Sequence, residues 1–170
     1  DVAKLEPYLR LARQLGSFAG QVTKTSVLRV TIEYEGAASR LNCQPLTAIL
    51  LQALLLPLLD SVNVVNAPLI ARQRGIDVRE VKREHSEDYQ TLIRLTVSTE
   101  RQERSIAGTI FAGDKPRIVE IKGIKIEAEL SNDMLYFTNE DKPGFIGGVG
   151  QILGNAGMNI ATFHLGRSST

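Results

Sequence analysis

The chain has 170 residues, of which 43% are hydrophobic and 23% charged. That composition supplies enough apolar side chains for a packed core and excludes a disordered class of protein. Twenty Lys and Arg residues face nineteen Asp and Glu residues, so the net charge of +1 lacks the basic surplus of a nucleic-acid-binding protein. We expect a globular protein of one medium or two small domains, with no nucleic acid as partner.

Soft metal ligands are scarce in the sequence. The single cysteine, Cys43, cannot form an internal disulfide, and only His85 and His164 could join it around a metal ion. We therefore expect no metal site and a reducing, cytoplasmic compartment. The most apolar window, residues 46–59, is shorter than the roughly 20 residues of a membrane helix, so no membrane association is expected. The chain begins at Asp1 with neither Met nor a signal-peptide pattern, and we interpret it as a piece of a longer protein.

The first half of the chain shows helix and strand patterns in turn. Apolar residues recur at helical spacing over 5–19, which predicts an amphipathic helix, and residues 28–35 alternate apolar and polar side chains as a half-buried strand does. Pro45 opens the Leu-rich window, which predicts a helix buried on most sides. A short helix then follows Asn66, its expected cap, and ends near Gly75.

Five strand-like runs come next, and they predict a mainly antiparallel sheet. The runs span residues 76–81, 90–97, 105–112, 117–121 and 124–130. Lys122 and Gly123 separate the last two runs and predict a tight hairpin, because glycine can take a positive φ. The fold class predicted for this region is α+β, a mixed or antiparallel sheet with flanking helices.

A polar break at residues 131–133 marks a change of sequence character, and we place a domain boundary there. The predicted domains are residues 1–131 and 132–170. Beyond the break the pattern predicts a strand over 134–138, a helix over 145–155 and a strand over 159–164. One β-α-β unit of this kind is half of a ferredoxin-like sheet, so the second predicted domain is partial.

Six of the fourteen glycines fall within residues 139–160. Their density invites comparison with a phosphate-binding loop, but neither the dinucleotide fingerprint nor the Walker motif is present, so a nucleotide site is disfavoured. We interpret Gly147, Gly148 and Gly150 as positions where the helix approaches a sheet or helix closely, because each glycine costs a helix about 1 kcal/mol against alanine. The predicted buried stripe of this helix is Ile146, Val149, Ile152 and Leu153, and Gly157 is expected to end it.

Asp141 has two interpretations. In one, it is an ordinary helix N-cap. In the other, its carboxylate and the Asn159 amide lie at the N-terminus of the helix, where backbone N–H groups have no partner within the helix. Such a place offers an acceptor to a ligand's ammonium group and donors to its carboxylate, as an amino acid requires. The chemistry of the motif alone leaves both interpretations open.

Several stretches carry a resemblance to a known family. The pattern D-K-P-G-x-I-G-x-V-G-x-I-L-G-x-A-G-x-N-I, from Asp141 to Ile160, resembles the opening half of an ACT domain, a small-molecule-sensing module. The motifs V-N-V-V-N-A-P at 62–68, A-R-Q-R-G-I at 71–76 and A-G-T at 107–109 resemble the intervening, allosteric substrate-binding domain of long-form D-3-phosphoglycerate dehydrogenase. The matches occur in the order of that family and cover nearly the whole chain.

The resemblance implies a parent enzyme that oxidises 3-phosphoglycerate with NAD in serine biosynthesis. It also implies ACT domains that bind L-serine as a feedback inhibitor at the interfaces of a homo-oligomer. The implied serine contacts are Asn139, Asp141 and Asn159, although some members have an aromatic residue in place of Asn139. The implied anion site, for phosphate or a phosphorylated substrate, contains Arg117 at a basic position of the family. Glu129 stands where some members have arginine, and Lys125, on the same strand face by the period of two, is the expected substitute.

No catalytic constellation is visible in the sequence, and a fragment without the NAD-binding and catalytic domains is expected to be inactive. Three interpretations of function stay open. The chain is a regulatory region that senses serine and an anion, a pure assembly module that binds nothing, or the β-domain of an iron–sulfur L-serine dehydratase. Arg72, Arg74 and the cations around Arg117 also have a plain interpretation as solvated surface charges.

Overall fold

The computed structural model describes residues 2–168, which form four α-helices and one six-stranded sheet. This is the predicted α+β class. The helices are α1 (Val2–Val22), α2 (Gln44–Leu55), α3 (Ala67–Gln73) and α4 (Phe145–Asn155), and a 3-10 turn spans Ala37–Arg40. The strands are β1 (Arg29–Gly36), β2 (Asp77–Arg83), β3 (Thr91–Ser98), β4 (Glu103–Phe111), β5 (Lys115–Ile121) and β6 (Ile124–Ala128). Contacts divide the chain into two compact units: one holds the sheet with α1, α2 and α3, and the other, Ser131–Leu165, holds α4.

The sheet is mixed, with strand order β2-β1-β3-β4-β5-β6. β1 and β2 pair in parallel, because the long connection through α2 and α3 returns the chain to the end of the sheet at which β1 begins. The other neighbouring pairs are antiparallel. Lys122 and Gly123 have φ values of 52° and 75°. Both central residues of the β5–β6 turn are therefore left-handed, and the predicted tight hairpin is confirmed.

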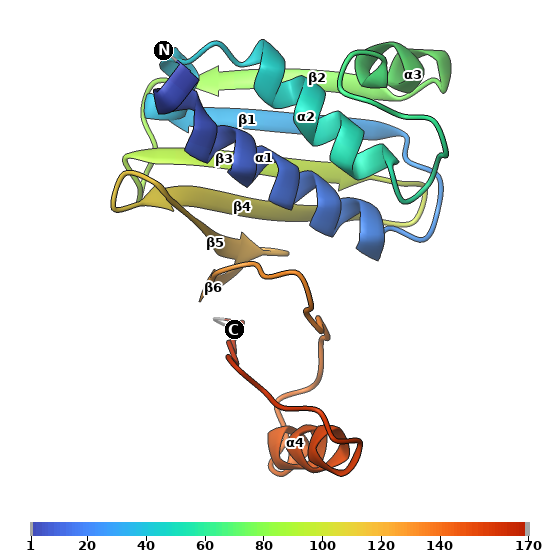
Figure 1. Ribbon diagram of the computed structural model, residues 1–170, viewed down its shortest axis with the longest axis vertical. Coiled ribbons are helices and arrows are strands. Elements are labelled where there is room, and N and C mark those ends of the chain that lie inside the picture. The colour runs from blue at the N-terminus through green and yellow to red at the C-terminus, as the bar shows by residue number, and fades with distance from the viewer. Residues whose placement is uncertain (1, 169–170) are drawn as a thin grey trace. The chain divides into compact units, whose positions relative to one another are not determined.

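Helices α1 and α2 cover one face of the sheet (Figure 1). The period of two along β1 decides which side chains lie beneath them: Val30, Ile32 and Tyr34 are fully buried, while the residues between them are partly exposed. The same face of β3 contributes Ile93 and Leu95 to the core. Among residues 2–130, no helix packs on the other face of the sheet, and we call it the helix-free face.

Two glycines bring α1 close to α2. A Cβ added at Gly16 would overlap the Leu50 carbonyl oxygen, and one added at Gly20 would overlap that of Leu54. Because this close approach needs residues without a side chain, the glycines that weaken α1 as an isolated helix are the ones that let it pack.

Helix α3 begins and ends where predicted, and Asn66 is its N-cap residue, but the Asn66 side chain makes no capping hydrogen bond. The Asn66 Oδ1 accepts a hydrogen bond from the Asn63 N–H at 2.8 Å, and no side chain caps the first turn. The predicted cap position is therefore confirmed, whereas the side-chain amide of Asn66 is used inside the preceding loop. At the other end Gly75 has a φ of 74°, and the Ile76 N–H donates to the Ala71 carbonyl at 2.9 Å. This is a Schellman motif, in which glycine supplies the left-handed residue.

In the second unit, α4 has the predicted bounds, and Gly157 ends it with a φ of 77°. The predicted strands over 134–138 and 159–164 are not formed, since neither segment pairs with another strand within the described residues. In a ferredoxin-like fold the two strands of one β-α-β unit are separated by a third. Neither segment can therefore find its neighbour inside this unit, and the ACT-like arrangement is compatible with the structure rather than shown by it.

The predicted burial of α4 is also wrong for this unit as it stands. None of the α4 residues is buried, and Ile152 of the predicted stripe is 69% exposed. A Cβ added at Gly147, Gly148 or Gly150 would meet nothing within 4 Å. So short a unit cannot bury an apolar helix by itself.

Candidate functional site

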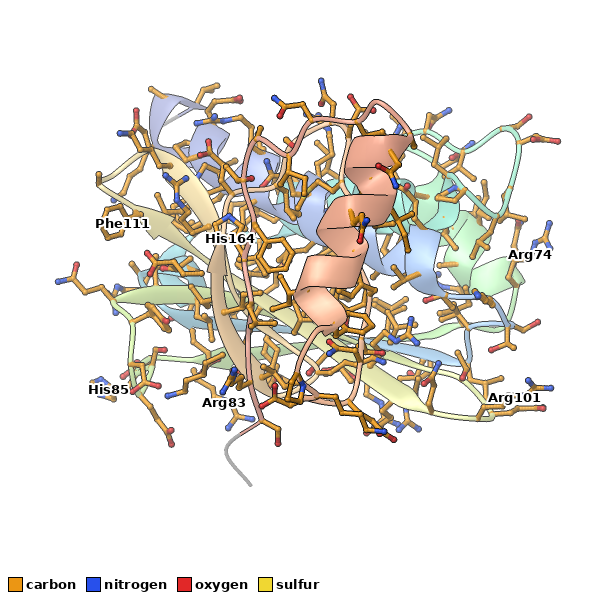
Figure 2. All side chains as sticks on the ribbon, turned by 90° about the horizontal axis from the view of Figure 1, so that it is seen from below. Arg74, Arg83, His85, Arg101, Phe111 and His164 are labelled. Atoms are coloured by element: carbon orange, nitrogen blue, oxygen red, sulfur yellow. The ribbon has the colours of Figure 1, made fainter. Side chains whose placement is uncertain are left out.

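A row of charged side chains crosses the helix-free face of the sheet. Arg94 of β3 donates to Glu120 of β5 at 2.9 Å and lies 3.8 Å from a carboxylate oxygen of Glu33 on β1. Arg83 of β2 pairs with the other oxygen of Glu33 at 3.0 Å. We call these four residues the ion-pair row; Figure 2 shows Arg83 on the side of the sheet that faces away from α1. The row joins strands that lie far apart in the sequence.

Arg94 is the centre of the ion-pair row. Its side chain is 25% exposed, so its charges are screened less than those of a free surface pair. Glu35 lies at the next position of the same face of β1, where burial raises the pKa of its carboxyl group, the nearby Arg94 opposes that shift and Glu33 adds to it. With Glu35 beside the row, three carboxylates lie near two arginines.

A hollow of about 420 Å³ lies beside Arg94, and it is lined also by Thr96, Gln102, Glu103, Ser105 and Lys122. Burial and, secondly, the charge of Arg104 lower the pKa of Lys122. The hollow contains both signs of charge, and Arg94 is already paired, so its chemistry selects neither anions nor cations.

Arg117, a residue of the predicted anion site, lies on β5 opposite Thr109 of β4. Its Nη2 is 3.6 Å from a carboxylate oxygen of Glu129, and its Nη1 donates to the Pro116 carbonyl at 3.0 Å. The Arg117 side chain is 22% exposed and that of Glu129 is 71% exposed. The Arg117 guanidinium group is thus already paired with a carboxylate of the same chain. That carboxylate, Glu129, lies on the solvent side of the guanidinium group, from which an anion would approach.

Lys125, the second residue of that site, is held by the loop between β2 and β3. Its Nζ donates to Asp88 Oδ2 at 3.1 Å, and this hydrogen bond, with the charge of Asp88, raises the pKa of Lys125. Asp88 belongs to residues 84–90, whereas Lys125 lies on the edge strand β6. The loop therefore reaches over β3, β4 and β5, whose buried residues Leu92, Ala107 and Val119 form a small apolar cluster.

The structure places both predicted anion contacts in the β5–β6 hairpin but gives each its own carboxylate partner. Exposed pairs of this kind contribute roughly 0–1 kcal/mol. A phosphate could displace Glu129 or Asp88 at small cost, because it offers more acceptor oxygens to the same cation. Within residues 2–168, no group of three or more His, Cys, Asp or Glu residues is arranged to hold a metal ion.

The predicted serine contacts all lie in the second unit and are exposed. Asn139 donates from its Nδ2 to the Glu140 carbonyl at 2.8 Å. The N-cap of α4 is Gly144, with a φ of 87° and no side-chain hydrogen bond to the first turn. The N-cap interpretation of Asp141 is therefore wrong, since it precedes the helix by several residues. Gly144 has no side chain with which to cap the first-turn N–H groups of α4, and such groups are the donors of an anion-binding helix N-terminus.

Sequence reasoning missed the ion-pair row. Its signal was present, because Glu33 and Arg94 are charged residues whose neighbours on either side in the strand are buried and largely apolar. Which polar residues face one another depends on strand order and register, however, and a slip of one residue would reverse the faces. The row could be found only once β1, β3 and β5 were placed.

The two-layer fold, with helices on one face and paired charges on the other, defines an α+β domain, and a family model makes the class specific. The model described as the D-3-phosphoglycerate dehydrogenase intervening domain matches residues 4–122. The chain belongs to this family of intervening domains. That assignment favours the dehydrogenase interpretation of the sequence over the iron–sulfur dehydratase.

Similar proteins are the D-3-phosphoglycerate dehydrogenases of Bacillus subtilis, Synechocystis and Methanocaldococcus jannaschii. Each is 36% identical to this chain, and the alignments cover 98%, 96% and 98% of it. They cover 32%, 30% and 32% of the relatives, so the chain spans about a third of their length. The similarity extends past the family match into the second unit. Within residues 2–168, no helix combines the length and the apolar character needed to span a membrane.

Proposed function

We propose that this chain is the regulatory and oligomerisation region of a D-3-phosphoglycerate dehydrogenase. The relatives bear that name, and their additional length leaves room for the catalytic and NAD-binding parts of a parent enzyme that oxidises 3-phosphoglycerate in serine biosynthesis. The chain itself supplies no catalytic group in this proposal. The proposal includes a cytoplasmic location. Burial raises the pKa of the Cys43 thiol, and a reduced, unreactive cysteine of this kind suits a reducing compartment.

One observation carries the effector part of the proposal: the N-cap residue of α4 is Gly144, which has no side chain to cap the helix, and Asp141 lies three residues before it in the sequence. L-Serine is a zwitterion, so it needs donors for its carboxylate and an acceptor for its ammonium group. The first-turn N–H groups of α4 supply the donors, and the carboxylate of Asp141 with the amides of Asn139 and Asn159 supplies the remaining polar contacts. The anion part rests on Arg117 and Lys125, which respond to phosphate or a phosphorylated substrate.

Regulation follows if serine binds one arrangement of the subunits more tightly than another. An effector can shift the equilibrium between two states only by its difference in affinity for them. In this proposal the ACT-like units of two subunits pair, and serine binds one arrangement of the pair more tightly than the other. The sheet domain would connect the paired units to the catalytic part of the enzyme.

Calorimetric titration with L-serine tests the effector site, using a chain extended through the second β-α-β half. Saturable heat is expected, and Asp141→Asn should abolish it because the ammonium group loses its carboxylate partner. Asp133→Asn, which removes the same charge from the preceding turn, should leave the heat unchanged. No saturable heat with L-serine, or equal loss in both variants, would refute the serine site.

Assembly without effector binding is the second candidate, and the exposed apolar residues of the second unit favour it. Three apolar side chains of this unit are exposed to water: Ile146 by 43%, Ile152 by 69% and Met158 by 61%. Exposed apolar surface is unfavourable in water, and an interface would bury it. Sedimentation velocity measures the oligomeric state of Ile152→Glu and of its control, Gln151→Glu. Both substitutions introduce a glutamate, but only Ile152→Glu also removes an apolar side chain. The assembly hypothesis predicts dissociation only for Ile152→Glu, with no effect of serine on the wild type; unchanged mass in both variants contradicts it.

A further inference from the structure

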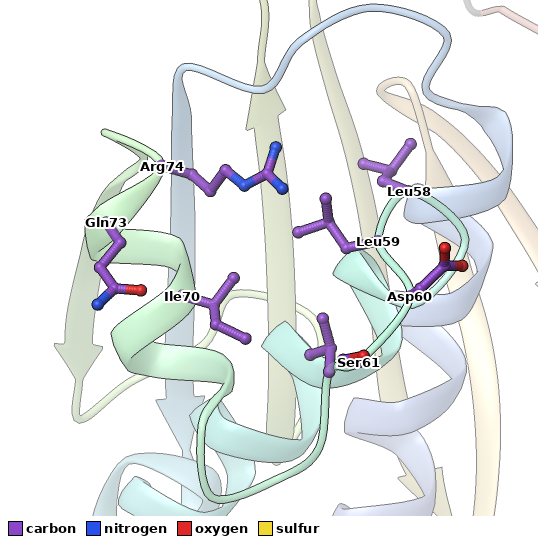
Figure 3. A pocket seen from close by; sticks show the side chains of 8 residues that line it. Leu58, Leu59, Asp60, Ser61, Ile70, Gln73 and Arg74 are labelled. Atoms are coloured by element: carbon purple, nitrogen blue, oxygen red, sulfur yellow. The ribbon is translucent and has the colours of Figure 1, made fainter.

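A hollow lies between the α2–α3 connection and the C-terminal half of α3 (Figure 3). Its volume is about 480 Å³, within the range of small-molecule sites. It is lined by Leu58, Leu59, Asp60, Ser61, Val62, Ile70, Gln73 and Arg74. None of these lining residues belongs to the predicted anion site at Arg117 and Lys125.

Both walls of the hollow are fixed by side-chain and backbone hydrogen bonds. In the loop wall, Asn63 Oδ1 accepts from the Val65 and Asn66 N–H groups, each at 2.9 Å, and Asn66 Nδ2 donates to the Ser61 carbonyl at 3.1 Å. In the helix wall, the Schellman motif at Gly75 sets the direction of the last turn. The hollow is thus preformed, which lowers the entropy that a ligand must overcome.

The chemistry of the hollow combines an apolar floor with one available cation. Leu59, Ile70 and Val62 are largely withdrawn from solvent and form the floor. The Arg74 guanidinium extends over it from the end of α3 (Figure 3) and has no hydrogen-bond or ion-pair partner among the described residues. The carboxylate of Asp60 points away from Arg74 in the same view, so the lining itself does not neutralise the cation.

We propose that this hollow binds a carboxylate joined to a short branched aliphatic group, with the carboxylate on Arg74 and the aliphatic group against Leu59 and Ile70. Arginine recognises a carboxylate through two parallel N–H donors, which fixes the orientation of the ligand. The aliphatic part then leaves water for the apolar floor, as in other small-molecule sites. The ligand is either a free acid or the terminal leucine-like residue of a peptide, since both present the same group.

Amide chemical-shift mapping by NMR on the 170-residue chain tests the proposal with isocaproate as the probe. We expect saturable shifts at Leu59, Ile70 and Arg74 with a dissociation constant on the order of 1 mM. Isocaproamide, which keeps the shape without the charge, and acetate, which keeps the charge without the aliphatic group, should each bind at least about tenfold more weakly. N-acetyl-alanyl-leucine and its C-terminal amide distinguish the sources: tighter binding of the peptide acid than of isocaproate identifies a peptide end, and weaker binding identifies a free acid.

Arg74→Gln should weaken isocaproate binding about tenfold, because a charge-assisted pair is replaced by a neutral donor. Arg72→Gln is the matched control: it removes the same charge from the same helix outside the hollow and should change the affinity by less than about twofold. The amide spectra of both variants report directly that they remain folded. Absence of saturable shifts in the wild type, or equal weakening by both substitutions, would overturn the proposal.

Discussion

The hydroxyl groups of Tyr34 and Thr47 lie 2.7 Å apart in the buried layer between β1 and α2. Thr47 also donates to Glu80 of β2 at 2.6 Å. A threonine hydroxyl has a single proton, so Tyr34 must be the donor in the first bond. Burial raises the pKa of Tyr34 well above its usual range, which keeps that proton in place. The two residues thus connect β1, α2 and β2 through one directed chain of hydrogen bonds.

We expect Thr47→Val to destabilise the protein more than Tyr34→Phe. Tyr34→Phe removes one hydrogen bond and leaves Thr47 with Glu80, at a cost of about 1 kcal/mol. Thr47→Val leaves the buried Tyr34 hydroxyl without an acceptor, at a cost of about 1–3 kcal/mol. Urea unfolding measures both free energies of unfolding, and a larger loss for Tyr34→Phe would contradict the assigned direction of donation.

A second prediction concerns the contact between α1 and α2. Alanine is the better helix former by about 1 kcal/mol, yet Gly16→Ala and Gly20→Ala should each destabilise the protein by about 1–3 kcal/mol because the new methyl overlaps a carbonyl oxygen of α2. Arg13→Ala, at an exposed position of the same helix, is the control and should stay within about 0.5 kcal/mol of the wild type. Thermal unfolding compares the three variants; a gain in stability at either glycine would show that the helices can move apart.

The sequence predicts elements well where their cause is local. The alternation along β1, the helical spacing of α1 and the glycine that ends α4 all depend on neighbours in the chain, and each was predicted correctly. The packing role of Gly16 cannot be predicted in this way, because its partner, the Leu50 carbonyl, lies far away in sequence.

The candidate site was less predictable for the same reason. Residue types identified Arg117 and Lys125, but their partners Glu129 and Asp88 depend on how the hairpin and the loop over 84–90 lie on the sheet. Residue type made Asp141 one candidate for the cap of α4, whereas the N-cap residue is Gly144, which has a left-handed backbone conformation. Strands over 134–138 and 159–164 fail because a strand needs a neighbour that their own unit does not contain.

The third prediction is that Arg94 matters more for stability than Lys125. Arg94→Met leaves the partly buried carboxylates of Glu33 and Glu120 without their shared cation, and we expect a loss of about 1–3 kcal/mol. Lys125→Met removes an exposed pair and should cost less than about 1 kcal/mol. A double-mutant cycle with Glu120→Gln measures the coupling directly, and zero coupling between Arg94 and Glu120 would rule out an energetic role for the ion-pair row.

Glu35 gives a prediction for pH dependence. Because burial, its largest cause, raises the pKa of Glu35 in the folded protein, the folded state binds that proton more tightly than the unfolded state does. The contribution to stability is present below the ordinary pKa of 4.5 and is lost as pH rises through the raised value. Glu35→Gln should therefore be more stable than the wild type at neutral pH, and the difference should vanish in acid.

Urea unfolding over a series of pH values measures that difference. Glu33→Gln serves as the comparison, because its carboxylate holds Arg83 and Arg94, and its loss should destabilise the protein at neutral pH. If Glu35→Gln loses stability at neutral pH as Glu33→Gln does, the attraction of Arg94 outweighs the burial of Glu35 and the assigned sign is wrong.

The last prediction concerns the predicted anion site. Glu129→Gln removes the carboxylate that faces the Arg117 guanidinium, so phosphate no longer competes with an internal anion, and we expect its affinity to rise about three- to tenfold. Glu127→Gln is the matched control, because it removes the same charge from an exposed position two residues earlier in the chain. If both substitutions raise the affinity equally, the gain reflects net charge alone. Titration of each variant with inorganic phosphate, followed by NMR at the Arg117 side chain, therefore separates a site at Arg117 from general attraction to the β5–β6 hairpin.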